Sequence, residues 1–467
     1  MRSARAVFEE LYVSRTPKSR QMYERARQYL AGGVPGGARY RKPYPLYLRE
    51  AKGSKLWDVD GNEYIDILLG AGPAILGHSP PAVIKAVKER LDRGTIMQVT
   101  VEPAVELAER ITRHMPGMEL LRFVNSGSEA VHIALRAARA YTGREKYAKF
   151  EGCYDGQMDN VLISGSVFSG PPDRPEAIPT SAGIPRSVLN DTIILPWNDT
   201  EAAVSLIRKH AKELAVVLIE PVGGIYLGGM PAEKSFLQAL REVTEKEGIL
   251  LIFDEVITGF RLGLSGACSL SGVIPDLRTL GKIIGGGFPV GAYGGRREIM
   301  EKVVAPPAPE EPRAAAKGRI FSSGTYSGNP ISMVAGLAMI RELEKPGFYE
   351  RINGLAERIR SGLVKMAGEM GFAMQVIGVG SLFSVHFANR LLKNVRDIMG
   401  SDRETAGAFY AGLVANGVYI PENHVAFTSA AHTDADVERI LAVSRTVLEE
   451  IKSPGPDRPL CYSISLP

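Results

Sequence analysis

Leu250-Leu251-Ile252-Phe253-Asp254-Glu255-Val256, together with the later stretch Thr279-Leu280-Gly281-Lys282, decides the fold of this chain. The first stretch is a short apolar run that ends in two carboxylates. An unbroken apolar run of this length predicts a strand that is buried on both faces of a parallel sheet. Asp254 and Glu255 then lie at the carboxyl end of the strand, where open α/β sheets bind their ligands.

Lys282 follows a glycine and precedes two isoleucines, Ile283 and Ile284. Apolar surroundings desolvate an ammonium group, which lowers its pKa and makes the neutral amine available as a nucleophile. A lysine for a Schiff base and an acid for a pyridine nitrogen are the two groups that pyridoxal phosphate chemistry requires of a protein. Taken alone, the same residues also fit a buried strand that ends in a polar turn, with Lys282 on the surface.

The composition is that of an ordinary globular protein. The chain has 467 residues, which corresponds to two or three domains, and its net charge of +4 comes from scattered basic residues that give no nucleic-acid signal. Cys153, Cys268 and Cys461 are too few and too dispersed for a disulfide framework or a zinc site. We find no signal peptide in Met1–Glu10 and no apolar run of membrane-spanning length. We therefore expect a cytoplasmic protein without nucleic-acid or membrane partners.

Strand-like and helix-like segments alternate through the middle of the chain, which predicts an α/β fold with right-handed crossovers and a parallel sheet. An Asp-Gly-Asn turn after Trp57 predicts a β-hairpin near the amino terminus. Two stretches, Ser166–Pro185 and Ala305–Lys317, are too long and polar to be buried, so we expect loops there. The expected divisions are an amino-terminal segment that forms part of a small domain (1–78), a large cofactor-binding domain (79–330), a helical linker with the small α+β domain (331–452) and a tail (453–467).

Three further motifs have the composition of binding turns. Asn125-Ser126-Gly127-Ser128-Glu129-Ala130 follows a predicted strand and opens a helix, so its N–H groups and hydroxyls form an anion cradle. Glu151–Gly156 carries Tyr154, which could stack on a flat ring, and Gly324–Pro330 resembles a second phosphate-binding turn. Each motif also fits a plain capped helix, a core-edge tyrosine or a glycine-rich loop.

Together these pieces resemble, in order and spacing, the class III (fold-type I) pyridoxal-phosphate-dependent aminotransferases. The resemblance extends from Tyr44 to the carboxyl-terminal helix and is strongest to glutamate-1-semialdehyde aminomutase and to the related β-amino-acid and D-phenylglycine aminotransferases. It implies a large, mainly parallel sheet domain with helices on both faces, plus a smaller α+β domain built from both termini. The segments that carry the likeness are Gly72–His78, Phe123–Ala130, Leu251–Arg261, Thr279–Gly287 and Ser327–Pro330.

The resemblance implies a role for each matching residue. Lys282 would form the Schiff base with pyridoxal 5'-phosphate and move protons, and Asp254 would pair with the pyridine nitrogen. Val256 and Tyr154 would pack on opposite faces of the ring. The remaining roles would be phosphate binding by Ser126, Gly127 and Ser128, support of the acid partner by Glu220, and a phosphate contact made across a homodimer interface by Thr325, which implies shared active sites.

The substrate side departs from the aminomutase pattern. Arg39 matches the arginine that binds the substrate carboxylate there, with Arg41 nearby. Ala71 stands where a tryptophan is usual, Asp155 replaces a histidine, and His424 replaces a carboxylate. These changes favour an aminotransferase that moves an amino group from an amino acid, including a β-amino acid, to a keto acid or aldehyde.

The alternative within the family is intramolecular transfer of the glutamate-1-semialdehyde aminomutase type. Outside it we considered an NAD-linked oxidoreductase, which the absence of a dinucleotide fingerprint disfavours. We also considered a non-catalytic binding protein, which the presence of both Lys282 and Asp254 disfavours. The sequence names neither the amino donor nor the acceptor.

Overall fold

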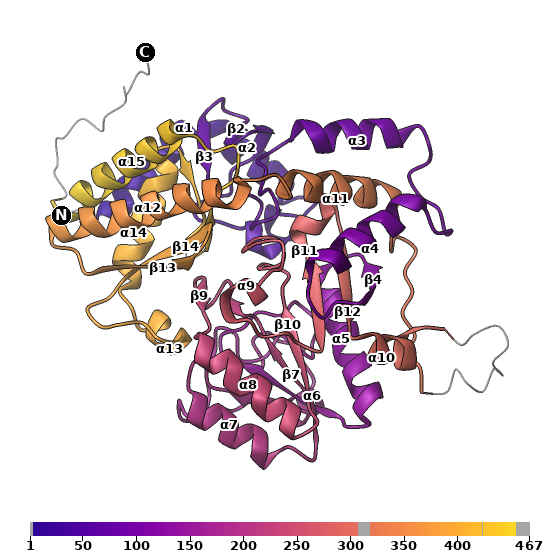
Figure 1. The fold of residues 1–467 in the computed structure, drawn as a ribbon. Helices are drawn as coiled ribbons and strands as arrows, with labels where there is room; N and C mark the ends of the chain where they lie inside the picture. Colours follow the sequence, from indigo (N-terminus) through magenta and orange to yellow (C-terminus); the bar gives the residue numbers. More distant parts are fainter. Residues whose placement is uncertain (1–2, 307–317, 423, 454–467) are drawn as a thin grey trace.

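The computed structural model describes residues 3–306, 318–422 and 424–453. Within these ranges the chain forms two packed regions, one around a seven-stranded sheet and one that combines residues from both ends of the chain (Figure 1). The expected loop at Ala305–Lys317 lies outside the described residues from position 307 onward. The expected tail does so from position 454 onward.

The large sheet confirms the predicted α/β class. Its central strand, β10 (Leu250–Asp254), pairs in parallel with β11 (Leu277–Gly281) and with β7 (Leu214–Ile219). Because the strands run side by side in one direction, Asp254 lies at the same edge of the sheet as the residue that follows β11, Lys282. The full spatial order is β4 (Leu120–Val124), β12 (Gly291–Gly295), β11, β10, β7, β5 (Lys146–Phe150) and β6 (Thr192–Leu195).

Strand β12 departs from the expected parallel alternation, because it runs antiparallel to both of its neighbours, β11 and β4. Its sequence, Gly-Ala-Tyr-Gly-Gly, has the composition of a loop. A Cβ at Gly291 would meet the Ser126 carbonyl oxygen at 2.1 Å, and one at Gly294 would meet the Leu120 carbonyl oxygen at 2.2 Å. Glycine is therefore required here for close approach of neighbouring backbones rather than for a turn.

Helices cover both faces of the sheet (Figure 1). Leu250 and Ile252 pack toward α5 (Gly127–Thr142), whereas Leu251 and Phe253 pack toward α7 (Thr200–Lys209) and α8 (Lys234–Lys246). Both faces of β10 are therefore buried, as its unbroken apolar run predicted. No helix within the described residues is long and apolar enough to cross a membrane. A third layer consists of α3 (Pro81–Leu91), α4 (Glu102–His114) and α11 (Pro330–Leu343).

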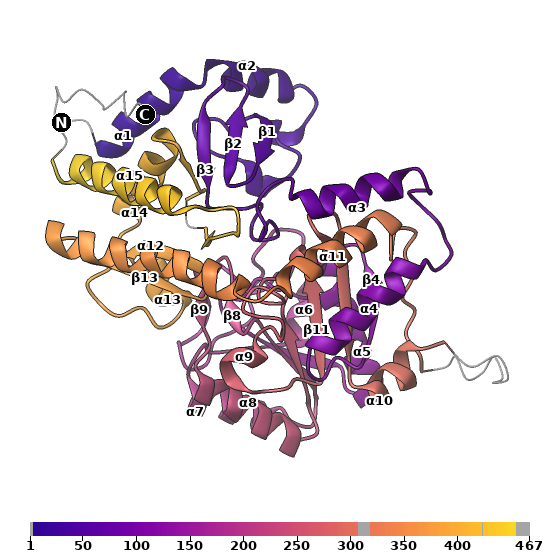
Figure 2. The ribbon, with the colours of Figure 1, turned by 45° about the horizontal axis from the view of Figure 1, so that its top comes forward.

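The second region joins the two ends of the chain (Figure 2). The predicted hairpin is confirmed as the antiparallel pair β2 (Lys55–Asp58) and β3 (Glu63–Asp66), and β15 (Val418–Tyr419) adds to β3 in parallel. A strand from near the carboxyl terminus thus completes an amino-terminal sheet. The other elements are β1 (Leu48–Lys52), β13 (Met374–Val379), β14 (Leu382–Phe387), β16 (Ala426–Phe427), α1 (Ala4–Arg15), α12 (Phe348–Met370), α14 (Arg403–Ala415) and α15 (Asp434–Lys452).

Several shorter elements connect these layers. The helices are α2 (Pro17–Ala26), α6 (Arg186–Asn190), α9 (Cys268–Ser271), α10 (Arg297–Ile299) and α13 (Val395–Met399), and the two-residue strands are β8 (Val222–Gly223) and β9 (Met230–Pro231). The predicted loop Ser166–Pro185 contains neither a helix nor a strand beyond one bridge between Ile163 and Pro179. Single turns η1 (Ala31–Gly33), η2 (Gly37–Arg39), η3 (Lys282–Gly285) and η4 (Met300–Val304) complete the set.

Arg261 ties the two regions together. It is fully buried and donates to the Thr428 carbonyl oxygen at 3.0 Å, to Ser381 Oγ at 3.1 Å and to the Gly72 carbonyl oxygen. Its guanidinium also lies 5.0 Å from the centre of the Phe427 ring. Burial lowers the pKa of Arg261 to about 9. Neutral acceptors from both ends of the chain therefore hold one cation that belongs to the large sheet region.

Glu255 does not face the edge of the sheet, because a second buried cation holds its carboxylate inside the protein. Its carboxylate pairs with Arg278 on the neighbouring strand, and both side chains have no exposed surface. It also accepts the backbone N–H of Ala267 at 2.6 Å and the hydroxyl of Thr258 at 3.2 Å. These contacts turn Glu255 into the protein, so Asp254 is the carboxylate of β10 that faces the edge where ligands bind.

We expect Glu255→Gln to lower the free energy of unfolding by about 3 kcal/mol, because Arg278 would keep a buried charge without its counter-ion. Urea unfolding of the purified protein measures this change. Glu344→Gln is the matched control, since Glu344 pairs with Arg110 where both side chains are 24% exposed. There we expect a loss of at most about 1 kcal/mol. Equal losses in the two variants would contradict the assigned importance of the buried pair.

Candidate active site

Asp254 is held at the end of β10 with one oxygen occupied. The Val256 N–H donates to its Oδ1 at 3.0 Å, and the Thr279 hydroxyl donates to the same atom at 2.9 Å. No hydrogen bond from a described residue reaches Oδ2, which leaves this atom for a donor on a ligand. Burial raises the pKa of Asp254 to about 7, with the charge of Asp155 as the next cause. An acid of this kind is ready to pair with a cationic ring nitrogen.

Lys282 comes directly after β11 and begins the single turn η3. Its backbone has a φ of 47°, in the left-handed region that side-chain-bearing residues seldom adopt, so the turn re-aims the side chain at the edge of the sheet. Burial lowers the pKa of the ammonium, while the nearby carboxylates of Asp254 and Glu220 oppose that shift. The geometry thus supplies a partly desolvated amine beside two acids, which suits a nucleophile.

The start of α5 forms the anion cradle that the sequence predicted. Ser126 caps the helix by accepting the Glu129 N–H at 3.2 Å, and Glu129 accepts the Asn125 N–H at 2.9 Å. The next N–H groups of this 16-residue helix remain directed outward, where the helix dipole favours an anion. A Cβ at Gly127 would lie 2.7 Å from both methyl carbons of Val256, so only glycine fits here.

Tyr154 and Glu220 form the far wall. The Tyr154 N–H donates to Glu220 Oε2 at 2.9 Å, and the Tyr154 ring packs edge-on against Tyr226, with ring centres 6.3 Å apart. Burial raises the pKa of Glu220 to about 8, followed by the effects of Asp155 and Asp254. Glu220 therefore keeps its proton at neutral pH, and it fixes the backbone from which Tyr154 projects.

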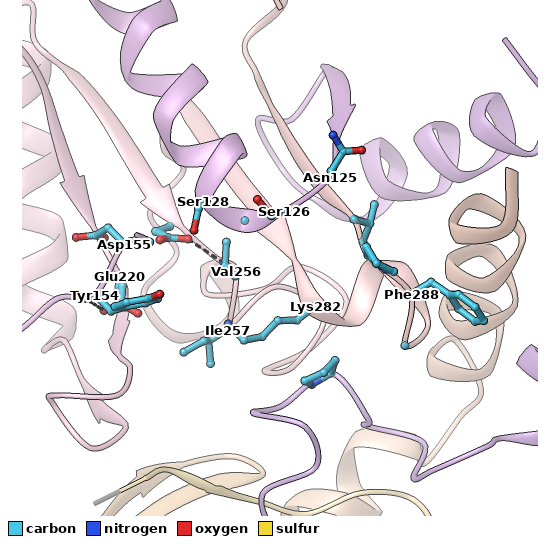
Figure 3. A pocket seen from close by; sticks show the side chains of 17 residues that line it. Asn125, Ser126, Ser128, Tyr154, Asp155, Glu220, Val256, Ile257, Lys282 and Phe288 are labelled. Atoms are coloured by element: carbon cyan, nitrogen blue, oxygen red, sulfur yellow. Dashed lines mark hydrogen bonds between the residues drawn. The ribbon is translucent and has the colours of Figure 1, made fainter. Parts of the chain in front are cut away.

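These side chains surround one cavity of about 430 Å³. Figure 3 shows Tyr154, Asp155 and Glu220 on one side of it, Asn125 and Phe288 on the opposite side, and Lys282 between them. The cavity brings together eight of the ten site residues that the sequence predicted, and leaves out Thr325 and Arg39, which are both exposed. The eight are Ser126, Gly127, Ser128, Tyr154, Glu220, Asp254, Val256 and Lys282.

Some lining residues were not predicted as site residues. Pro73 and Ile257 lie inside the segments that carried the family resemblance, but nothing in their residue type indicates a site. Gly287, Phe288 and Pro289 belong to the glycine-rich run after Lys282, whose composition allows close backbone approach to a ligand. Asp155 appeared in the sequence only as a departure from the family pattern.

The cavity fits pyridoxal phosphate. A flat ring with a phosphate, an aldehyde and a basic nitrogen needs an anion cradle, an amine and an acid, and α5, Lys282 and Asp254 supply these around one space. Val256 and Tyr154 line the same space as a branched aliphatic chain and an aromatic ring. The close approach of Gly127 to Val256 shows that the start of α5 packs directly against this side chain.

Comparisons with known proteins agree with this geometry. The model of the class III aminotransferase family matches residues 37–438. Glutamate-1-semialdehyde 2,1-aminomutase 2 from Brevibacillus brevis is 42% identical over 441 residues, covering 93% of this chain and 98% of that protein. The omega-transaminase from Sphaerobacter thermophilus is similar in structure with a TM-score of 0.88, at 38% identity, covering 94% of this chain and 99% of the other.

A β-phenylalanine aminotransferase from Variovorax paradoxus is also similar, with a TM-score of 0.83 at 32% identity, covering 96% of this chain and 97% of the other. The chain therefore belongs to the class III aminotransferase family. It is an enzyme that uses pyridoxal phosphate, as the resemblance of its motifs implied.

The lowered pKa of Lys282 predicts that its amine becomes reactive at a lower pH than that of an exposed lysine. Competitive labelling of the cofactor-free protein with trace acetic anhydride, read by mass spectrometry across a pH series, measures the midpoint for each lysine. Lys85, whose side chain is 78% exposed, is the internal reference. A midpoint for Lys282 at or above that of Lys85 would contradict the desolvated amine.

Proposed function

We propose that this enzyme is an intermolecular aminotransferase that takes an amino group from an amino acid, including a β-amino acid, and passes it to a separate keto acid or aldehyde. The observation that carries the proposal is an arginine in a second cavity, Arg41, whose buried Nη1 has no hydrogen-bond partner among the described residues. This cavity has a volume of about 560 Å³ and is lined by Arg41 and His424, among others. The charge of Lys282 contributes to lowering the pKa of His424, so the two groups are near one another.

Each residue of the first cavity has its own proposed role. Pyridoxal phosphate, when bound, supplies an aldehyde that captures an amine and a ring that withdraws electrons. Lys282 would be the covalent anchor. Once released, its uncharged amine would accept a proton from the substrate carbon and donate it to the cofactor carbon. Asp254 offers Oδ2 to the ring nitrogen, and Ser126, Gly127 and Ser128 bind the phosphate. Val256 and Tyr154 confine the ring, and Glu220 supports that wall.

Arg41 is the guanidinium best placed for a substrate carboxylate. Its Nη1 is buried and has no hydrogen-bond partner among the described residues, and its guanidinium lies 5.3 Å from the centre of the Tyr12 ring. Burial lowers the pKa of Arg41. A buried donor without an acceptor is costly, and a carboxylate from a ligand would satisfy it.

The family resemblance gave this role to Arg39, with Arg41 as the neighbouring candidate. Arg39 ends the turn η2, is exposed and lines neither of these two cavities. The described geometry thus supports Arg41 more strongly, while both arginines lie on the same short loop. Paired substitutions at the two positions separate them.

His424 and Ala71 favour transfer between two molecules over the aminomutase alternative, which several related proteins carry in their names. Burial is the main cause of the lowered pKa of His424, so a neutral ring stands where the resemblance would place a carboxylate. Ala71, with a φ of 66°, puts only a methyl group into the turn before Gly72 and Pro73. Neither residue supplies a charge or bulk that would retain a small semialdehyde.

We further propose that two copies of the chain share their sites, in a cytoplasmic homodimer. Asn329 donates to the Thr95 carbonyl oxygen at 2.9 Å and so joins the segment before α11 to the segment before α4. Large exposed apolar side chains gather on these two segments, which favours a protein partner. Those side chains are Ile96, Met97, Val99, Phe321 and Tyr326. Thr325 lies among them and away from the cavity of its own chain, so it would reach the phosphate of a second copy.

Cys153 and Cys268 are free thiols, which fits the proposed reducing, cytoplasmic compartment.

The direct test of the function is a panel of α-, β- and γ-amino acids and simple amines, with the absorbance of the bound cofactor followed after each addition. We expect amino acids to convert the cofactor and amines without a carboxylate to convert it poorly. Glutamate-1-semialdehyde is the decisive comparison. Its efficient conversion to 5-aminolevulinate, without an added acceptor, would establish the aminomutase alternative instead.

Arg41→Ala should raise the KM for an accepted amino acid about tenfold or more, because a charge-assisted hydrogen bond to a carboxylate contributes ~1.5–3 kcal/mol. Arg39→Ala should change it about twofold or less. Turnover of an amine without a carboxylate should respond to neither change, which controls for general damage. The reverse order of effects would return the role to Arg39.

Lys282→Ala and Thr325→Ala subunits should complement one another if sites are shared. Each homodimer should be impaired, the first because it lacks the amine and the second because it holds the phosphate weakly. A mixed dimer contains one site with both residues intact, so mixing should restore activity toward half of the wild-type value. No gain on mixing, under conditions where subunits exchange, would exclude a contribution of Thr325 across an interface.

A further inference from the structure

The cofactor cavity contains a buried ion pair that the catalytic roles above do not use. Lys149 on β5 and Asp155 in the following loop have no exposed side-chain surface, and their charged atoms, Nζ and Oδ2, are 3.1 Å apart. Asp155 also lines the cavity next to Tyr154 and Glu220 (Figure 3). It is the residue that replaces the histidine of the family pattern.

The hydrogen bonds of Lys149 leave this carboxylate without a donor. An ammonium group has three N–H donors. Those of Lys149 are taken by the carbonyl oxygens of Cys153 at 2.8 Å, Val161 at 2.7 Å and Ile163 at 3.0 Å. Neither oxygen of Asp155 has a hydrogen-bond partner among the described residues. Lys149 therefore pairs with Asp155 mainly through charge, and the carboxylate oxygens keep acceptor capacity inside the cavity.

The backbone fixes Asp155 in this position. Its φ is 42° and that of Gly156 is 113°, so two successive residues in the left-handed region make a sharp turn. The Gln157 N–H that follows donates to Ser128 Oγ at 3.2 Å, and a Cβ at Gly156 would lie 2.8 Å from the same oxygen. The turn is thus clamped between β5 and the start of α5, and the carboxylate has little freedom to move away.

The other titratable groups around Asp155 determine what its charge acts on. Burial raises the pKa of Tyr147 to about 12 and that of Cys153 well above its usual range, so both are uncharged at neutral pH. Glu220 is protonated there too. Burial also raises the pKa of Asp155, while the charge of Lys149 opposes that shift. Of the charges around Asp254, that of Asp155 has the largest effect on its pKa after burial.

We propose that Asp155, paired with Lys149, is a positioning residue that places a negative charge in the same cavity as Asp254 and so strengthens the hold of Asp254 on a cationic ring nitrogen. The inference rests on the proposed pairing of Asp254 with that nitrogen. A negative charge near a cationic acid raises its pKa. The ring therefore keeps its proton, and its capacity to withdraw electrons, to a higher pH than with a neutral residue at position 155.

The test is an NMR titration of the holoenzyme with pyridoxal phosphate labelled with ¹⁵N in the ring, because the nitrogen shift reports protonation directly and needs no turnover. Asp155→Asn removes the charge at constant size and leaves Lys149 bound to its three carbonyl oxygens. Asp155→His installs the residue of the family pattern, and serves if the first variant folds poorly. In both we expect the midpoint of ring deprotonation to fall by about one pH unit or more relative to wild type.

Glu344→Gln is the matched control, since it removes one carboxylate charge from an ion pair outside the cavity, and its midpoint should equal that of wild type. An unchanged midpoint in both Asp155 variants with cofactor bound would overturn the proposal. So would loss of cofactor binding in two folded variants, which would make Asp155 a binding residue instead. A wild-type enzyme that binds the cofactor but fails to transaminate would count against the proposed function and leave this measurement intact.

Discussion

Buried carboxylates at one edge of the sheet are the constraint on which the rest of this structure depends. Strand β10 ends in Asp254 and Glu255 follows it directly, and both carboxylates are buried from water. Arg278 on the adjacent strand satisfies Glu255 on one side, and Thr279 with the Val256 N–H satisfies one oxygen of Asp254 on the other. Because Glu255 is fully occupied inside the protein, Asp254 is the carboxylate left at the edge, beside Lys282, whose pKa burial lowers.

Two arginine side chains attach the second region to the region of the large sheet. Arg261 follows Asp254 by seven residues and is held by carbonyl and hydroxyl oxygens from Gly72, Ser381 and Thr428. On the far side, Arg396 of α13 forms a two-pronged pair with Glu151, at 2.8 Å for each bond, just past the end of β5. Both contacts start next to cavity residues. A shift of the second region would therefore move residues next to the cavity walls.

The sequence predicted the α/β class from local signals, and the family resemblance of several local motifs predicted the residues of the cofactor cavity. A strand, a glycine-permitted turn and a helix start each occupy a few consecutive residues, and parallel pairing brings their carboxyl ends together. The antiparallel strand β12 was not predicted, since its three glycines have loop composition and only the backbone contacts explain them. The pair of Lys149 and Asp155 was not predicted either, because nothing in the apolar strand around Lys149 shows that its ammonium folds back onto the following loop.

The proposed substrate site, the second cavity, depends on contacts between segments that are far apart in the chain. The lining of the second cavity comes from α1 and the loop of Arg41, both near the amino terminus, and from the segment around His424, which follows them by several hundred positions. They meet because β15 adds to the amino-terminal sheet and α14 packs on α1. Small changes in that packing decide which arginine of one short loop turns inward, as the exposed Arg39 and the half-buried Arg41 illustrate. The proposed cofactor site is therefore encoded in local segments of the large sheet region, whereas the proposed substrate site requires the two ends of the chain to pack together.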